Sequence, residues 1–203
     1  MQIKLMNIKQ EVKKMKETRH IEIRTEQSES QDMVITGTPI VFNTPTNIND
    51  PMGQYTEVIE RNALDGVDLN DTRLLVNHEY NRIPLAKTPK TMELWTDEKG
   101  LQMRAVLPDT EEARSVYTAV KRGDMAGMSF SFTTDGDGSH YDVEKRTRTI
   151  SRINKLYECS IVNFPAYQTA SVEARSQMQE AEQEEKRKEQ AKIKINQLLK
   201  RGI

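Results

Sequence analysis

Residues 20–164 alternate apolar and polar side chains in a way that predicts a run of β-strands. We expect strands at 20–26, 33–42, 55–60 and 72–78, a hairpin over 91–108 that turns at 97–100, and further strands at 128–134, 141–145 and 148–164. Gly37 indicates a bend or bulge, and Pro39 favours an edge position for its strand. Residues 43–54 are rich in Pro, Asn and Gly, which predicts a loop.

One internal helix is expected at 108–124, besides a short helical turn within 62–70. Asp109 can cap the helix, with Glu112 three residues later completing a capping box. The sequence Lys-Arg-Gly at 121–123 suits its C-terminal end. Its apolar stripe consists of Ala113, Val116, Tyr117 and Val120.

The two ends of the chain differ from its middle. Residues 1–17 place apolar side chains at helical spacing among lysines, which predicts a helical extension, or else an untranslated leader if Met15 is the true start. Residues 173–203 are rich in Glu, Gln, Lys and Ala, acidic first and basic later, which predicts a charged helical tail. We therefore expect a core domain over 18–172 and an α+β fold, mainly antiparallel: a sheet or small barrel with flanking helices.

Composition narrows the class of protein. The net charge of −1 gives no reason to expect nucleic acid or an anionic membrane as a partner. Cys159 is the single cysteine and cannot form an internal disulfide, as is typical of a reducing compartment. Because no apolar run reaches membrane-spanning length and the basic N-terminus lacks a signal-peptide core, we expect a soluble, cytosolic protein.

Three histidines offer few choices for a catalytic base. His78 ends the apolar strand 72–78 and leads into a loop, so a rigid element would hold its imidazole. His20 precedes a strand near the N-terminus, and His140 follows a Gly-rich turn. The ordinary alternative for His78 is a strand-end histidine that binds a backbone carbonyl.

The segment 127–132 (GMSFSF) contains the candidate nucleophile. In a strand, Met128, Phe130 and Phe132 share a buried face, while Ser129 and Ser131 share the other face. A serine on a stiff strand is well placed for attack, because a misplacement of about 1 Å can cost a hundredfold in rate. Solvent-facing hydroxyls on a half-buried strand are the ordinary alternative.

Glu158 interrupts an otherwise apolar strand, 156–162. A buried carboxylate needs a partner, and a histidine N–H would serve, as in the third member of a catalytic triad. Alternatives are an ion pair with Arg152 or Lys155, or exposure on an edge strand. Cys159 points to the opposite face and is interpreted as a small buried hydrophobe. No metal or cofactor is expected, because no cluster has ligand spacing and no phosphate-binding loop is present.

Four segments together resemble the tailed-phage prohead protease family, whose fold is related to that of the herpesvirus assemblin proteases. Residues 74–79 (LLVNHE) resemble its histidine motif, and 127–132 its serine motif. Residues 156–167 (LYECSIVNFPAY) resemble the last core strand with its Pro-Ala exit, and 35–43 (ITGTPIVFN) the opening strand. The resemblance covers about residues 18–175.

The resemblance implies Ser129 as nucleophile, His78 as general base and Glu158 as third member, and it favours Ser129 over Ser131. It implies a protease domain with an assemblin-like barrel over 18–172. It also implies a role inside the immature capsid, in the host cytoplasm: cleavage of the scaffold region of the major capsid protein, and then of the protease itself. A homo-oligomer is compatible with this role.

Two other functions compete with this interpretation. A non-enzymatic capsid assembly or scaffolding protein would also have charged helical ends. A barrel that binds oligonucleotides would require basic and aromatic residues interleaved on one face, and aromatic residues make up only 5% of the chain.

Overall fold

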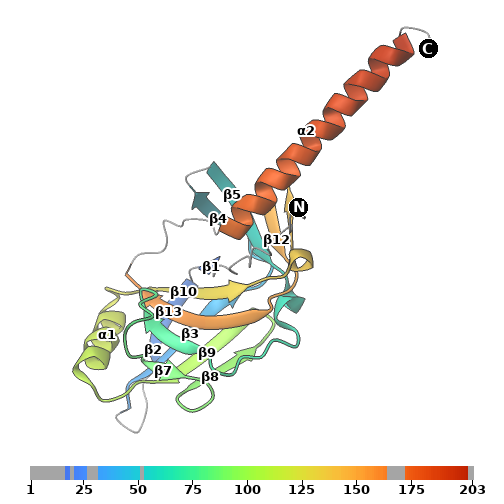
Figure 1. Cartoon of the computed structure of the whole chain (residues 1–203). Helices are drawn as coiled ribbons and strands as arrows, with labels where there is room; N and C mark the ends of the chain where they lie inside the picture. The colour runs from blue at the N-terminus through green and yellow to red at the C-terminus, as the bar shows by residue number, and fades with distance from the viewer. Residues whose placement is uncertain (1–16, 19–20, 27–31, 51–52, 164–171, 201–203) are drawn as a thin grey trace, which may run out of the picture.

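The computed structural model describes residues 17–18, 21–26, 32–50, 53–163 and 172–200. Within these ranges the chain forms a large sheet, a smaller sheet and two α-helices (Figure 1). The helix predicted over residues 1–17 lies almost wholly outside the described residues. Of these residues only Glu17 is described, and it belongs to a strand.

The large sheet has the strand order β7-β6-β13-β10-β2-β3-β9-β8, with β1 also paired to β10. Its pairs are antiparallel except β6 with β13. The strands are β1 (Glu17–Thr18), β2 (Ile21–Glu26), β3 (Val34–Val41), β6 (Arg73–Val76), β7 (Ala86–Lys87), β8 (Met92–Thr96), β9 (Gly100–Val106), β10 (Gly127–Thr133) and β13 (Lys155–Val162).

The expected closed barrel is wrong for the part of the chain that the structure describes. Closure would require the two end strands, β7 and β8, to pair, and the sheet order leaves both at open ends. β7 contains only two residues, so it offers few hydrogen-bonding groups to a further strand. The fold is therefore α+β with mixed, mostly antiparallel sheets.

Strand β3 corrects one prediction and confirms another. The register against β9 shifts between Gly37 and Ile40, which confirms the irregularity predicted at Gly37. The edge position inferred from Pro39 is wrong, because β3 lies between β2 and β9. Pro39 falls within the register shift, where a residue without an N–H leaves no ladder position unfilled.

The main core lies on one face of β10. Met128, Phe130 and Phe132 are fully buried there, as their spacing predicts, and the two phenylalanine rings stack with centroids 5.3 Å apart. Helix α1 (Glu111–Arg122) adds Ala113, Val116 and Val120 to the same core.

The N-terminal cap of α1 differs from the prediction by one residue. Thr110, not Asp109, is the N-cap, and its hydroxyl accepts a hydrogen bond from the N–H of Ala113. Asp109 instead pairs with Arg114, one turn into the helix. The predicted capping box is therefore absent from α1, whereas Gly123 ends the helix in the left-handed conformation (φ 83°), as expected.

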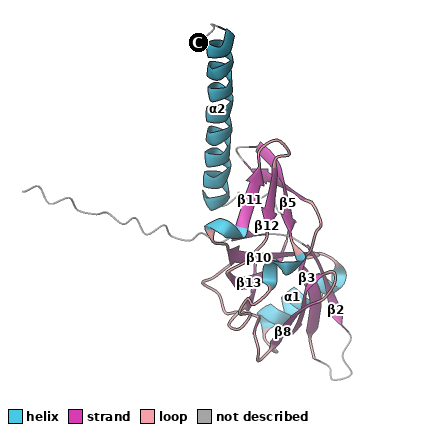
Figure 2. Ribbon diagram, turned by 90° about the vertical axis from the view of Figure 1, so that its right-hand side faces the viewer, coloured by secondary structure: helices cyan, strands magenta, loops and turns pink. Residues whose placement is uncertain are grey.

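The smaller sheet has the order β11-β12-β5-β4 and stands beside the large one (Figure 2). Its strands are β4 (Thr46–Asp50), β5 (Gly53–Ile59), β11 (Ser139–Asp142) and β12 (Thr147–Ile150). The loop predicted at 43–54 is thus largely a strand, because Ile48 is buried opposite Tyr55 and local Pro and Asn content does not report that pairing. Two 3-10 helices, Arg61–Leu64 and Gly136–Gly138, complete the connections.

A buried ion pair joins the two central strands of this sheet. Arg148 and Glu57 face each other in the parallel β12–β5 pair, with Nη1 and Oε2 3.3 Å apart. Their side chains are 0% and 2% exposed, and Arg148 also donates to the hydroxyl of Ser139. Buried charges are tolerated only when they are paired in this way.

Helix α2 (Val172–Lys200) projects from the smaller sheet (Figures 1 and 2). Ala181 packs against the small cluster formed by Ile48, Tyr55 and Tyr141. From residue 183 to residue 197 every described side chain is exposed. Neither of the described helices is long and apolar enough to cross a membrane.

Candidate active site

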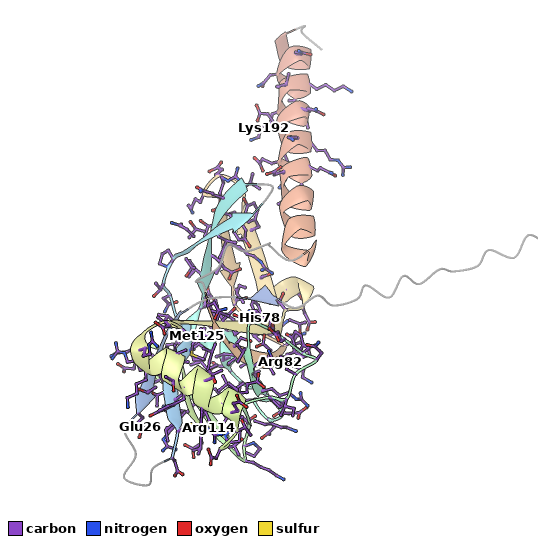
Figure 3. All side chains as sticks on the ribbon, turned by 90° about the vertical axis from the view of Figure 1, so that its left-hand side faces the viewer. Glu26, His78, Arg82, Arg114, Met125 and Lys192 are labelled. Atoms are coloured by element: carbon purple, nitrogen blue, oxygen red, sulfur yellow. The ribbon has the colours of Figure 1, made fainter. Side chains whose placement is uncertain are left out.

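His78 lies in a turn that begins where β6 ends, in the body of the molecule and far from Lys192 on the projecting part of α2 (Figure 3). Asn77 and His78 both have left-handed backbones, with φ of 48° and 60°. Such a conformation costs a non-glycine residue about 1–3 kcal/mol and persists only where its surroundings enforce it.

Strand β13 holds this turn in place. The N–H of Asn77 donates to the carbonyl of Ile161 (2.9 Å), continuing the β6–β13 ladder by one residue. The side-chain oxygen of Asn77 accepts from the N–H of Asn163 (3.1 Å), and the N–H of His78 donates to Ser160 Oγ (3.2 Å). The neighbouring strand therefore fixes the backbone that carries the imidazole.

Glu158 faces His78 from the centre of the sheet. Its side chain is 1% exposed, and its Oε1 lies 2.7 Å from His78 Nδ1. An ionised carboxylate can only accept, so it pairs with the tautomer of the neutral imidazole that carries its hydrogen on Nδ1, and in that tautomer Nε2 keeps a free lone pair. The alternatives of an edge strand or a pair with Arg152 or Lys155 are wrong, because β13 lies between β6 and β10 and the carboxylate binds His78.

Two further hydroxyls bind the same carboxylate. Ser160 donates to Glu158 Oε2 (2.6 Å), and Tyr80 donates to Oε1 (3.3 Å). Sequence reasoning missed both residues. The signal for Ser160 was its position two residues after Glu158, which places it on the same face of the strand. Tyr80 gave no comparable signal.

Ser129 and Ser131 lie on the face of the sheet that carries Glu158. In the β10–β13 pair, Ser129 is directly opposite Ser160, and Ser131 is opposite Glu158. Side chains directly opposed in an antiparallel pair share a face and have Cβ atoms about 4.5–5.5 Å apart. Both serines are buried, at 0% and 2% exposure, so the alternative of solvent-facing hydroxyls is wrong.

The hydroxyls of the two serines differ in their partners. The Ser131 hydroxyl is hydrogen-bonded to the Tyr80 hydroxyl, with the two oxygens 3.0 Å apart. Ser129 Oγ and His78 Nε2 are each buried without a hydrogen-bond partner among the described residues. Buried polar atoms are rarely left unpaired, so two such atoms set this part of the sheet apart from the core around it. A hydroxyl and a ring nitrogen with a free lone pair are therefore both available on one face.

The pKa values of two further groups near Glu158, the Tyr80 phenol and the Cys159 thiol, are both raised. Although Tyr80 as a whole is 52% exposed, partial burial of its phenol and then the nearby Glu158 carboxylate raise the pKa of that phenol above its ordinary value, so Tyr80 stays a hydrogen-bond donor through neutral pH. Burial, and then Glu158, raise the pKa of the fully buried Cys159 thiol well above its usual range. Cys159 belongs to the core and not to the site. No group of three potential metal ligands occurs among the described residues.

Comparison with protein families assigns the chain. The family model of the caudovirus prohead serine proteases matches residues 19–185, most of the chain. The chain belongs to this family. As a prohead serine protease it is a serine peptidase of phage capsid maturation, and the alternative of a non-enzymatic scaffolding protein is not favoured.

Two other comparisons accompany the family assignment. The chain is similar to the solved structure of the capsid assembly protease gp21 of bacteriophage T4, with 12% identity and a TM-score of 0.43, over 73% of this chain and 99% of that chain. A search of curated proteins found no match. The assignment of this prohead serine protease rests on the family model.

Proposed function

We propose that the prohead serine protease cleaves peptide bonds with Ser129 as nucleophile, His78 as general base and Glu158 as the residue that orients His78. The observation that carries this proposal is the set of contacts on one face of the sheet: Glu158 Oε1 holds His78 Nδ1 at 2.7 Å, and the unpartnered Nε2 and Ser129 Oγ share that face. Ser131 is the weaker candidate because its hydroxyl is bound to Tyr80.

The reaction follows from these positions. His78 Nε2 removes the Ser129 hydrogen as Oγ attacks the scissile carbonyl, and the resulting imidazolium is stabilised by Glu158. The imidazolium then protonates the leaving amine as the C–N bond breaks, which leaves an acyl-enzyme at Ser129. Water, deprotonated by the same imidazole, attacks the acyl group and releases the free acid and Ser129.

The proposed substrates are the scaffold region of the major capsid protein precursor and then the protease itself, inside the immature capsid in the host cytoplasm. Family membership supports a substrate within the prohead. The projecting α2 supports self-cleavage, because its exposed residues 183–197 are open to a second copy of the protease. Such self-cleavage between copies requires only a transient encounter and is compatible with a homo-oligomer.

Co-expression of the full chain with the major capsid protein of the same phage tests the substrate. We expect a capsid protein shortened at one end, together with a shortened protease, both located by mass spectrometry. A capsid protein of full length beside a self-processed protease would contradict the proposed substrate but not the proposed chemistry. Full-length forms of both proteins would contradict the proposed function.

Replacing Glu158 with glutamine tests its orienting role. The glutamine side chain would keep the shape but donate an amide hydrogen or offer a neutral acceptor, so the imidazole would lose both its fixed tautomer and its counter-charge. We expect turnover to fall about 10³–10⁴-fold, less than on loss of the nucleophile. Cleavage of the capsid precursor over time provides the measurement, and a wild-type rate would leave Glu158 with a structural role only.

A further inference from the structure

The hydroxyl of Ser160 connects two parts of the site that the proposed chemistry needs in a fixed relation. It accepts a hydrogen bond from the backbone N–H of His78 (3.2 Å) and donates one to Glu158 Oε2 (2.6 Å). A serine hydroxyl has one hydrogen and two lone pairs, so both bonds form together. Ser160 is fully buried, so water does not compete for either bond.

The bond to His78 acts on a backbone under strain. His78 is the second of two consecutive residues with positive φ, and the N–H bonded to Ser160 belongs to it. Without the Ser160 hydroxyl, this end of the turn would lose a polar contact to β13. The contacts of Asn77 with Ile161 and Asn163 would remain, so the turn would loosen at His78 while staying attached.

The bond to Glu158 acts on the orientation of the carboxylate. The terminal torsion of a glutamate is broad and only weakly restricted by itself. Ser160 binds Oε2, so the other oxygen, Oε1, is turned toward His78 Nδ1. The Tyr80 hydroxyl also donates to Oε1, but over the longer distance of 3.3 Å.

We propose that Ser160 is a positioning residue: its hydroxyl holds the His78 backbone and the Glu158 carboxylate in the positions that aim the imidazole at Ser129. Its place directly opposite Ser129 in the β10–β13 pair puts this hydroxyl beside the position of the reacting groups. Ser160 is not itself the nucleophile in this proposal, because its hydrogen is committed to Glu158 and not to His78 Nε2. The proposal rests on the proposed function.

The test compares Ser160→Ala with Tyr80→Phe in the full chain. Each variant removes one hydroxyl donor from Glu158, but only Ser160→Ala also frees the His78 N–H. We expect Ser160→Ala to lower kcat for capsid-precursor cleavage about 10–100-fold with KM unchanged, the size of effect that a misplaced catalytic group produces. Tyr80→Phe should cost less, and Ser160→Thr, which restores the hydroxyl, should recover most of the lost rate.

A second readout needs no substrate. In the wild-type chain the Nδ1–H of His78, bound to Glu158, should give a far-downfield proton NMR signal, and Ser160→Ala should broaden or shift it at unchanged pH. The Tyr80→Phe variant, which removes the longer bond to Oε1 and leaves the contact of the His78 N–H in place, should change that signal less than Ser160→Ala does.

Three results would overturn the proposal: wild-type kcat in Ser160→Ala, an unchanged downfield signal in that variant, or a loss of cleavage as complete as that of a Ser129 variant. Failure of the proposed function would look different, since the wild-type chain would then not cleave while the NMR comparison could still be made.

Discussion

Replacing Ser129 with alanine is expected to abolish cleavage of the capsid precursor and of the protease, with a loss of about 10⁶-fold in kcat. The variant should fold normally, because Ser129 Oγ has no hydrogen-bond partner among the described residues and its removal leaves no donor or acceptor orphaned. Co-expression with the capsid protein, followed by mass spectrometry, measures the cleavage, and thermal unfolding of the purified variant checks the fold.

Ser131→Ala is the matched control. Ser131 lies two residues along the same strand, on the same face and similarly buried, but its hydroxyl binds Tyr80. This variant should retain most of the activity. If Ser129→Ala still trims the precursor while Ser131→Ala does not, the nucleophile is Ser131 and the assignment is wrong.

Replacing Glu57 with glutamine is expected to cause the largest loss of stability among the changes considered. Arg148 is 0% exposed and would keep its charge without the carboxylate that now lies 3.3 Å away. Removing one partner of a buried ion pair typically costs about 3–5 kcal/mol. Urea unfolding, with the free energy extrapolated to water, provides the measurement.

An exposed ion pair supplies the comparison for this variant. Arg104 Nε lies 3.1 Å from Glu26 Oε2, but the two side chains are 35% and 42% exposed. Glu26→Gln should therefore change the free energy of unfolding by less than about 1 kcal/mol. Equal changes in the two variants would show that burial adds nothing to the Arg148–Glu57 pair.

The strands with strict alternation could be predicted from the sequence because the apolar residues of each strand alone define its buried face. Met128, Phe130 and Phe132 specify a buried face without reference to any other segment. Strand β4 could not be predicted in this way. Its residues are mostly polar, and Ile48 becomes buried only when β5 lies beside it. Closure of the sheet likewise depends on the pairing of distant strands, which no local pattern reports.

In the candidate site, too, some residues could be identified from the local sequence and others only from the fold. His78, Ser129 and Glu158 stand out locally, as a strand-end histidine, a serine in a packed strand and a carboxylate in an apolar strand. Ser160 and Tyr80 do not, because a hydroxyl acquires a role only from what folds against it.

The cap of α1 illustrates a smaller limit of sequence reasoning. Asp109 and Thr110 are both residues that cap helices well, so the sequence offers two adjacent candidates. The choice depends on the backbone that enters the helix, and Thr110 has the extended conformation that the N-cap position requires. The predicted cap is therefore one residue too early.

The parallel pairing of β6 with β13 has a consequence for synthesis of the enzyme. His78 and Glu158 meet although they are 80 positions apart in the chain, and apart from the two-residue β7 the strand β6 pairs with β13, the last strand of the large sheet. A chain still attached to the ribosome before β13 has emerged would contain the proposed nucleophile and base, but it would lack Glu158 and the strand that pairs with both β6 and β10. We therefore expect no peptide cleavage by a nascent chain until β13 has been synthesised and the large sheet can form.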